Sequence, residues 1–436
     1  MSTVVTVVGA GLAGCEAAWQ LAERNIRVNL IEMKPEKYTP AQSSSNFSEL
    51  VCSNSFRSND LTNAVGLLKE EMRKLNSLII KSADETRIPA GGALAVDRER
   101  FAELITSKIQ SHPNINVIEQ EVTEIPDGKV IIATGPLTSD DLSGSIMKLL
   151  PDSKMLSFYD AAAPIVTSDS IEMNKAFFAS RYDKGDADYI NCPMDKDEYI
   201  AFYEALITAE CASVHGFEDK SVFEGCMPIE VMAKRGVDTM RFGPLKPVGL
   251  RDSRTGKESY AVVQLRMDNA EGTIYNIVGF QTHLKFGEQK RVFSMIPGLE
   301  NADFVRYGVM HRNTYIDSPK LLDRYFRLRQ DIRISFAGQI TGVEGYVESA
   351  ASGLLCGIET ANQLNGLPSV DFPAETAIGA LALYISTGSV SNFQPMNINF
   401  GIISPLDIKV KGKRDKNLAI SKRSLDTIEC IAEKKQ

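Results

Sequence analysis

The chain opens with short apolar runs that alternate with segments of helical spacing. The run Val4–Val8 predicts a buried strand, residues 12–24 predict a helix, and residues 26–31 predict a second strand. Further apolar runs predict strands at residues 116–122 and 129–133. Helical spacing predicts one helix carrying Leu68, Met72, Leu75 and Ile79, and another, capped by Asp97, carrying Phe101, Leu104, Ile105 and Ile109. This alternation predicts an α/β fold with a parallel sheet.

The pattern changes near residue 160. Aromatic, mixed-charge sequence follows, with a helix expected over residues 196–211 and paired strands over 259–268 and 272–281. A buried strand at 332–336 and a helix of small residues running to 364 then restore the first pattern. We therefore expect an inserted α+β domain at 161–325, between the first part of a nucleotide-binding domain, 1–160, and its second part, 326–436.

The turn after the first strand carries a dinucleotide-binding fingerprint. Gly9, Gly11 and Gly14 follow the pattern G-x-G-x-x-G, with Ala10, Leu12 and Ala13 between them, and the second strand ends at Glu32. The glycines allow a tight turn, a close approach of backbone to a pyrophosphate, and close helix–strand packing. The helix N-terminus offers free N–H groups to that anion, and Glu32 would accept hydrogen bonds from a ribose.

A second strand–glycine–helix unit lies more than 300 residues further on. It contains Gly338, Gln339, Gly342 and Tyr346, and a further strand ends in an A-T-G turn at Gly135. A long cofactor whose two ends need two helix N-termini would explain this separation, which favours FAD over NAD. Since no second complete fingerprint occurs, we expect no separate NAD(P)H domain. The predicted fold is thus an FAD-binding Rossmann-like domain with an inserted domain.

Composition indicates the cellular location of the protein and argues against some kinds of site. The 436 residues carry a net charge of −8 and contain no apolar run long enough for a membrane span. The first strand begins at once, which leaves no room for a signal peptide, so we expect a cytoplasmic protein. The seven cysteines form no C-x-x-C pair and the four histidines are scattered, which argues against a local zinc site and a disulfide framework.

Three residues are candidates for chemistry. Cys226 precedes a basic stretch and Cys52 has Arg57 nearby, and neighbouring cations favour the reactive thiolate. Either cysteine could instead be a small buried hydrophobe. His283 lies between glycines in GFQTHLKFG, where it could stack on a flat ligand or simply be exposed.

Two basic clusters could contact nucleic acid. One contains Lys246 and Arg251, and the other lies in the C-terminal tail, at Lys409, Lys411, Lys413 and Arg414. A solvated helix with a basic face is the alternative for the tail.

Long blocks of the sequence resemble a known family. Among them are ELVCSNSFRSN, SRYDKGDADYINCPM, FEGCMPIEVMAKRG, YNIVGFQTHLKFG and FAGQITGVEGYVESAASGL. With VVGAGLAGCEAAWQLAERN they make the whole chain resemble the folate- and FAD-dependent tRNA (uracil-5-)-methyltransferases of bacteria. A related, longer family of wobble-uridine modifiers carries an additional C-terminal domain.

The resemblance implies a defined reaction. A cysteine adds to C6 of a uracil, C5 takes the methylene group of 5,10-methylenetetrahydrofolate through reduced FAD, and NAD(P)H re-reduces the flavin. It implies Cys226 and Cys52 as the catalytic pair, with Cys226 favoured as nucleophile and Cys52 as proton-transfer partner, although the reverse assignment stays open. It also places Tyr346 near the isoalloxazine and His283 against the folate, and suggests a homodimer.

Alternatives stay open for the RNA target and for the class of function. Relatives often carry a His-His pair where this chain has Gln42 and Ser43, and Leu where Phe56 stands. The T-loop of tRNA is the expected target, and a uridine of large-subunit ribosomal RNA is the alternative. A small-molecule NAD(P)H–flavin oxidoreductase and a non-catalytic FAD-bound RNA-binding protein are alternatives of other classes.

Overall fold

The structure, a computed structural model, describes residues 4–39, 41–150, 156–183, 186–212, 227–388 and 393–433. Its first layer is a six-stranded sheet with the order β16-β17-β7-β1-β2-β6. The strands pair in parallel, except that β16 is antiparallel to β17 at one edge. Their bounds are β1 Val4–Val8, β2 Arg27–Glu32, β6 Ile115–Glu119, β7 Lys129–Ile132, β16 Arg327–Leu328 and β17 Asp331–Phe336.

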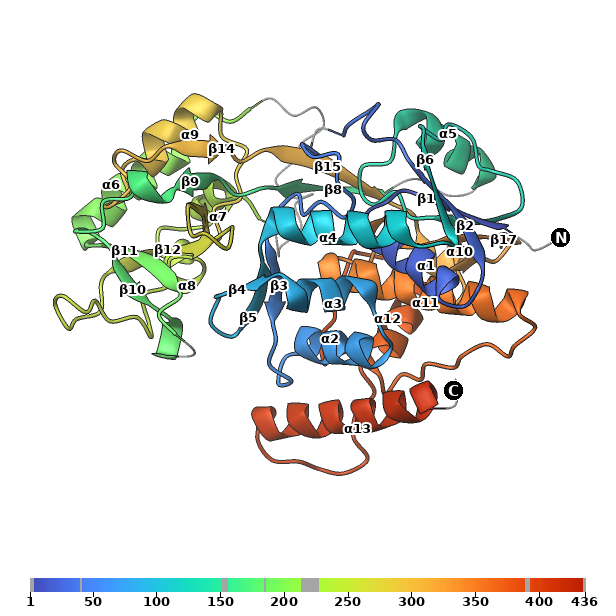
Figure 1. Cartoon of the computed structure of the whole chain (residues 1–436). Coiled ribbons are helices and arrows are strands. Elements are labelled where there is room, and N and C mark those ends of the chain that lie inside the picture. The colour runs from blue at the N-terminus through green and yellow to red at the C-terminus, as the bar shows by residue number, and fades with distance from the viewer. Residues whose placement is uncertain are drawn as a thin grey trace.

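Helices cover this sheet, and two of them lie side by side although they are far apart in sequence (Figure 1). These are α1, Leu12–Ala22, and α11, Tyr346–Leu364. A β-carbon on Gly353 would lie 2.1 Å from the Ala13 carbonyl oxygen, so only glycine permits this close approach. The other helices of this part are α2 Ala64–Lys74, α3 Leu78–Glu85, α4 Arg98–Ser111, α5 Asp140–Leu149, α10 Ser318–Leu321, α12 Ala377–Ser386 and α13 Lys413–Glu433.

A second, antiparallel sheet of six strands lies beside the first domain, at the left of Figure 1. Its order is β10-β11-β12-β13-β9-β14, and it has its own hydrophobic core, running from Val166 to Phe304. The strands are β9 Ile165–Thr167, β10 Phe177–Ala179, β11 Tyr189–Met194, β12 Ala261–Met267, β13 Ile274–Ile277 and β14 Phe304–Arg306. The helices are α6 Lys196–Ile207, α7 Ile229–Lys234, α8 Thr239–Phe242 and α9 Phe286–Phe293.

An antiparallel ribbon connects the two parts. It pairs β8, Leu156–Ala161, with β15, Met310–Tyr315. A small three-stranded sheet, β3 Ser55–Ser58, β5 Ala93–Val96 and β4 Arg87–Ile88, lies between the helical layer and the antiparallel sheet. We propose that the ribbon marks the boundary of the inserted domain expected at 161–325.

The predicted α/β class with a parallel sheet is confirmed, as are the paired strands β12 and β13. The helix expected around Leu68–Ile79 is wrong in one respect, because the segment forms two helices. Asn76 takes a positive φ of 61° and the Ser77 side chain caps α3, so the chain turns between them. The helix expected over 196–211 ends at Ile207. No helix of the described ranges is long and apolar enough to cross a membrane.

Candidate cofactor and active site

The first glycine turn has the geometry that its sequence predicts. Gly9 takes a φ of 97°, which disfavours any side chain. A β-carbon on Gly14 would lie 1.8 Å from the Gly9 carbonyl oxygen, so helix α1 packs on this turn only with glycine there. Gly11, in contrast, has no atom within 4 Å of its would-be β-carbon, and it begins α1 with no side-chain cap. The open space and the uncapped amides suit an anionic ligand.

Glu32 closes the turn from the end of β2. Its carboxylate accepts hydrogen bonds from the Ala10 amide at 2.7 Å and from the Lys34 amide at 3.1 Å, and the residue is almost fully buried. The carboxylate is therefore fixed at the end of the strand, at the position where the fingerprint would present it to a ribose.

The second glycine unit lies against the start of α1, where a β-carbon on Gly338 would be 3.0 Å from the Ala13 β-carbon. Gly338 and Gly342, with φ of 83° and 81°, enclose the short turn Gln339–Thr341, and Tyr346 then begins α11. Helix α11, like α1, has no side-chain cap at its N-terminus. Two uncapped helix N-termini from distant parts of the chain thus lie at one site.

Both units line a single cleft. Nine of the predicted cofactor-binding residues line it: Gly9, Gly11, Leu12, Ala13, Glu32, Gly135, Gly338, Gln339 and Tyr346. Ala10, Gly14 and Gly342 shape the turns around it and are not among its lining residues. Its two glycine turns, which come from distant parts of the chain, fit an elongated dinucleotide such as FAD.

Cys52 lies beside this cleft, joined to it by Tyr346. The Tyr346 Oη accepts hydrogen bonds from the amides of Cys52, at 2.9 Å, and Ser53, at 3.1 Å. Burial, together with the neighbouring Cys52 thiol, raises the pKa of Tyr346 well above its ordinary range, so the phenol stays protonated. The Cys52 thiol donates to the Ala161 carbonyl at 3.4 Å, and Val51 lines the cleft itself.

Three arginines hold the loop that carries Cys52. Arg98 donates to the Leu50 carbonyl, Arg306 to the Val51 carbonyl at 2.8 Å, and Arg266 to the Ser53 hydroxyl at 2.8 Å. Arg98 is itself fixed by both carboxylate oxygens of Asp268, at 3.0 Å each. Sequence reasoning missed these arginines, and no local motif signals them.

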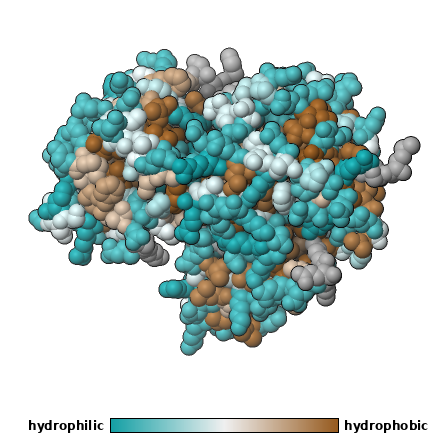
Figure 2. All heavy atoms as spheres, viewed as in Figure 1, coloured by the Kyte–Doolittle hydropathy of each residue, from teal (hydrophilic) through white to brown (hydrophobic). Residues whose placement is uncertain are grey.

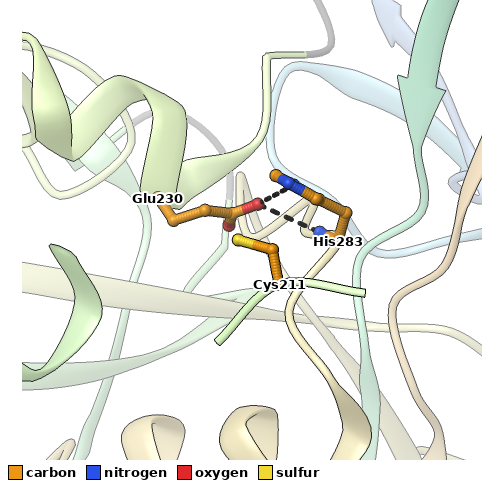
Figure 3. A group of neighbouring side chains, drawn as sticks. All are labelled: Cys211, Glu230 and His283. Atoms are coloured by element: carbon orange, nitrogen blue, oxygen red, sulfur yellow. Dashed lines mark hydrogen bonds and ion pairs between the residues drawn. The ribbon is translucent and has the colours of Figure 1, made fainter. Parts of the chain in front are cut away.

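His283 lies in a group with Glu230 and Cys211, in which His283 and Glu230 are buried and Cys211 is half-buried (Figure 3). The Glu230 carboxylate forms an ion pair with Nδ1 of the His283 ring. It also accepts hydrogen bonds from the His283 amide at 3.0 Å and from the Thr282 hydroxyl at 2.7 Å. Burial alone would lower the pKa of His283, but hydrogen bonds to Cys211 and Glu230 raise it to about 9. The imidazole is therefore held protonated and in one orientation.

These three side chains could also present ligands to a metal ion, since their ligand atoms lie within 4.8 Å of one another. In this structure the carboxylate oxygens of Glu230 accept the hydrogen bonds named above. The residues are 19 to 72 positions apart, so local spacing could not indicate the group.

Cys226 lies outside the described residues. Described residues before and after its segment are hydrogen-bonded to the stretch 281–283. The Ala212 amide donates to the His283 carbonyl at 2.7 Å, and the Ile229 amide donates to the Gln281 carbonyl at 2.7 Å.

The two basic clusters lie on different parts of the molecule. Lys246 and Arg251 lie between α8 and β12 in the antiparallel part. Lys409, Lys411, Lys413 and Arg414 are all exposed, at and before the start of α13, which lies below α2 in Figure 1. The structure therefore does not join them into one patch.

Comparisons with known proteins identify the family of the chain and support its fold. The family model of glucose inhibited division protein A matches residues 4–368. A methylenetetrahydrofolate–tRNA-(uracil-5-)-methyltransferase of Lactobacillus gasseri is 61% identical over 433 residues, 99% of each chain. The enzyme of that name from Listeria monocytogenes is 60% identical over 99% of this chain and 100% of its own. The solved structure of Aquifex aeolicus GidA has a TM-score of 0.71 at 15% identity, covering 99% of this chain and 73% of that one, which supports the fold.

Proposed function

Since the chain belongs to the glucose inhibited division protein A family and, within it, to the methylenetetrahydrofolate–tRNA-(uracil-5-)-methyltransferases, we propose that it forms 5-methyluridine in tRNA. The methylene group would come from 5,10-methylenetetrahydrofolate, with NAD(P)H as the reductant. The T-loop is the proposed site of modification, and the cytoplasm is the proposed place of action.

One observation carries this proposal. The hydrogen bond from the Cys52 amide to Tyr346 Oη joins residues 294 positions apart and connects a candidate catalytic thiol to the cofactor cleft. Removal of the C5 proton of a uracil, the step proposed for Cys52, uses a thiol held there, whereas hydride transfer from NAD(P)H to a small acceptor does not require one.

The chain's own residues would hold FAD along the cleft. The amides at the start of α1 would face the pyrophosphate, Glu32 would accept the ribose hydroxyls, and Gly338, Gln339 and Tyr346 would face the flavin end. Bound FAD would supply the reducing electrons that turn a transferred methylene group into a methyl group.

The two thiols would have different roles in the reaction of the uracil. The Cys226 thiolate would add to C6 of the base, which makes C5 nucleophilic. After C5 has gained its new carbon, Cys52 would take the C5 proton while the bond from that carbon to its donor nitrogen breaks. The methylene carbon would then gain a hydride equivalent and become a methyl group, and the C6–sulfur bond would break to release Cys226 as thiolate. Arg98 and Arg266, which bind the loop of Cys52, would hold this thiol in place for the step.

His283 would contact the folate. Its imidazole is held protonated by Glu230, which suits a flat, electron-rich ring system. The basic cluster at the start of α13 would contact RNA phosphates. A homodimer, expected from the resemblance, belongs to the same proposal.

The function is tested by mapping 5-methyluridine in the total tRNA and ribosomal RNA of cells that lack the protein. We expect loss of the modification from the tRNA T-loop. Loss from large-subunit ribosomal RNA alone would redirect the proposal to that target, and unchanged 5-methyluridine in both would contradict it.

A further inference from the structure

Three aromatic rings stack at one edge of the antiparallel sheet. Tyr307 lies between Phe286 and Phe304, with ring centroids 4.9 Å and 5.4 Å away and interplanar angles of 19° and 9°. Phe304 belongs to the edge strand β14, and Phe286 begins α9. The end ring, Phe286, is 55% exposed, so the stack ends at solvent. Figure 2 shows hydrophobic residues on the surface over β14.

A buried glutamine joins the two backbone segments that carry Phe286 and Tyr307. The Gln289 side-chain amide donates to the carbonyls of Leu284 and Gly308, at 2.8 Å each, and its oxygen accepts the Gly308 amide at 2.8 Å. It therefore ties the segment before Phe286 to the residue after Tyr307. Because the backbone of the two segments is joined before a ligand binds, less of it has to be ordered on binding.

The residues next to the stack contact the neighbours of both His283 and Cys52. Gly308, next to Tyr307, packs against Thr282 and Ala162. Thr282 precedes His283 in the chain. Ala162 follows Ala161, whose carbonyl accepts a hydrogen bond from the Cys52 thiol. Arg306 lies between Phe304 and Tyr307 in sequence, and it donates to the Val51 carbonyl.

The surroundings carry positive charge. Lys285 precedes the exposed ring, and Lys290 and Arg291 lie on the next turn of α9, all exposed. Glu210 pairs with Lys285, and Glu288 with Arg291 at 2.6 Å, so acidic groups moderate this charge. The surface combines a flat apolar ring with nearby cations, as nucleic-acid-binding surfaces for single strands do.

We propose that the stack of Phe286, Tyr307 and Phe304 is a platform on which an unpaired base of the RNA substrate stacks. This rests on the proposed function and specifies how that function selects its substrate. Bases within a duplex present no free face, so the platform favours a loop or an unstacked nucleotide. It would hold a base near Cys52 while the target uracil occupies the active site.

The test compares three variants of the full-length, FAD-loaded protein. Phe286→Ala removes the exposed ring, and Phe286→Trp keeps a stacking face. Phe178→Ala is the control, because Phe178 is similarly exposed, at 51%, but lies on β10, at the opposite edge of the same sheet. The measurements are the Kd for an unmodified tRNA transcript at several salt concentrations, the Kd for methylenetetrahydrofolate, and flavin reduction by NAD(P)H without RNA.

We expect Phe286→Ala to raise the Kd for RNA roughly tenfold, within the range for loss of one base–aromatic stack. The slope of log Kd against log salt should not change, because stacking releases no counterions. Phe286→Trp and Phe178→Ala should bind RNA as the wild type does, and all variants should keep wild-type flavin reduction and folate affinity.

Two results would overturn the platform. One is wild-type RNA affinity in Phe286→Ala, and the other is a loss of folate affinity with RNA binding retained, which would assign the rings to the folate instead. If the wild-type protein itself bound and methylated no RNA, the proposed function would fail. If instead the protein binds and methylates RNA, and Phe286→Ala changes neither, only the platform proposal fails.

Discussion

At the scale of single residues, the site depends on contacts that fix Cys52 and His283. Tyr346 and three arginines hold the backbone around Cys52, and Glu230 holds the His283 ring through its Nδ1 and its amide. Both candidate groups thus have their positions fixed before any ligand binds, which reduces the cost of reaching a reactive geometry.

Tyr346→Phe tests the first of these contacts. The change leaves the half-buried amides of Cys52 and Ser53 without their acceptor, so we expect the free energy of unfolding to fall by about 1 kcal/mol. Urea denaturation measures this effect. Tyr38→Phe, which changes an exposed tyrosine, should alter it by less than about 0.5 kcal/mol. Equal effects of the two changes would show that the Tyr346 hydroxyl does not anchor the loop.

Glu230→Gln tests the charge on His283. The pKa of His283 is raised from 6.5 to about 9, so the protonated imidazole stabilises the folded state. This contribution is complete below about pH 6.5 and is lost as the pH rises through about 9. The stability difference between wild type and Glu230→Gln should therefore be largest near pH 6, at most about 3 kcal/mol, and should shrink by about pH 10. A difference independent of pH would mean that Glu230 acts on His283 only as a neutral hydrogen-bond partner.

At the scale of elements, two strand–glycine–helix units form the cofactor site. Much of this could be predicted from the sequence, because strand, turn and helix are local and each glycine has a local reason to be there. The loop around Cys52 could not be predicted, because Arg98, Arg266 and Arg306 bind it from 48, 213 and 255 positions away. The break at Asn76 was missed because helical spacing continues across it, while a positive φ interrupts the helix.

Gly11→Ala and Gly14→Ala separate two roles of the first turn. Gly11 has an ordinary φ of −77° and open space around it, so Gly11→Ala should fold with wild-type stability but bind FAD weakly. A β-carbon on Gly14 would collide with the Gly9 carbonyl, so Gly14→Ala should lower the stability of the apoprotein itself, by about 1–3 kcal/mol. Thermal denaturation of the apoproteins and FAD titration measure the two effects. Wild-type FAD affinity in Gly11→Ala would contradict the assignment of this turn to the pyrophosphate.

At the scale of the whole molecule, basic residues gather at separate places on a chain of net charge −8. The cluster at the start of α13 and the one between α8 and β12 lie on different parts of the structure. If the RNA contacts both clusters, each should contribute independently to binding, because they belong to different parts of the structure.

Replacing Lys409, Lys411, Lys413 and Arg414 with Gln should weaken RNA binding and flatten its salt dependence. The slope of log K against log salt should decrease by roughly 0.7–0.9 for each phosphate that the variant no longer neutralises. Because the clusters are apart, adding Lys246→Gln and Arg251→Gln should lower the slope further by an additive amount. An unchanged slope in both sets would remove these clusters from the RNA interface.

The central claim is that this chain places a folate-derived carbon on C5 of a uridine in RNA. The most direct measurement incubates the FAD-loaded protein with an unmodified tRNA transcript, NAD(P)H and methylenetetrahydrofolate carrying a heavy isotope in its methylene group, followed by mass spectrometry of the nucleosides and mapping of the modified position. We predict labelled 5-methyluridine in the T-loop, which disappears with Cys52→Ala and with Cys226→Ala. Oxidation of NAD(P)H without any labelled 5-methyluridine would contradict the claim.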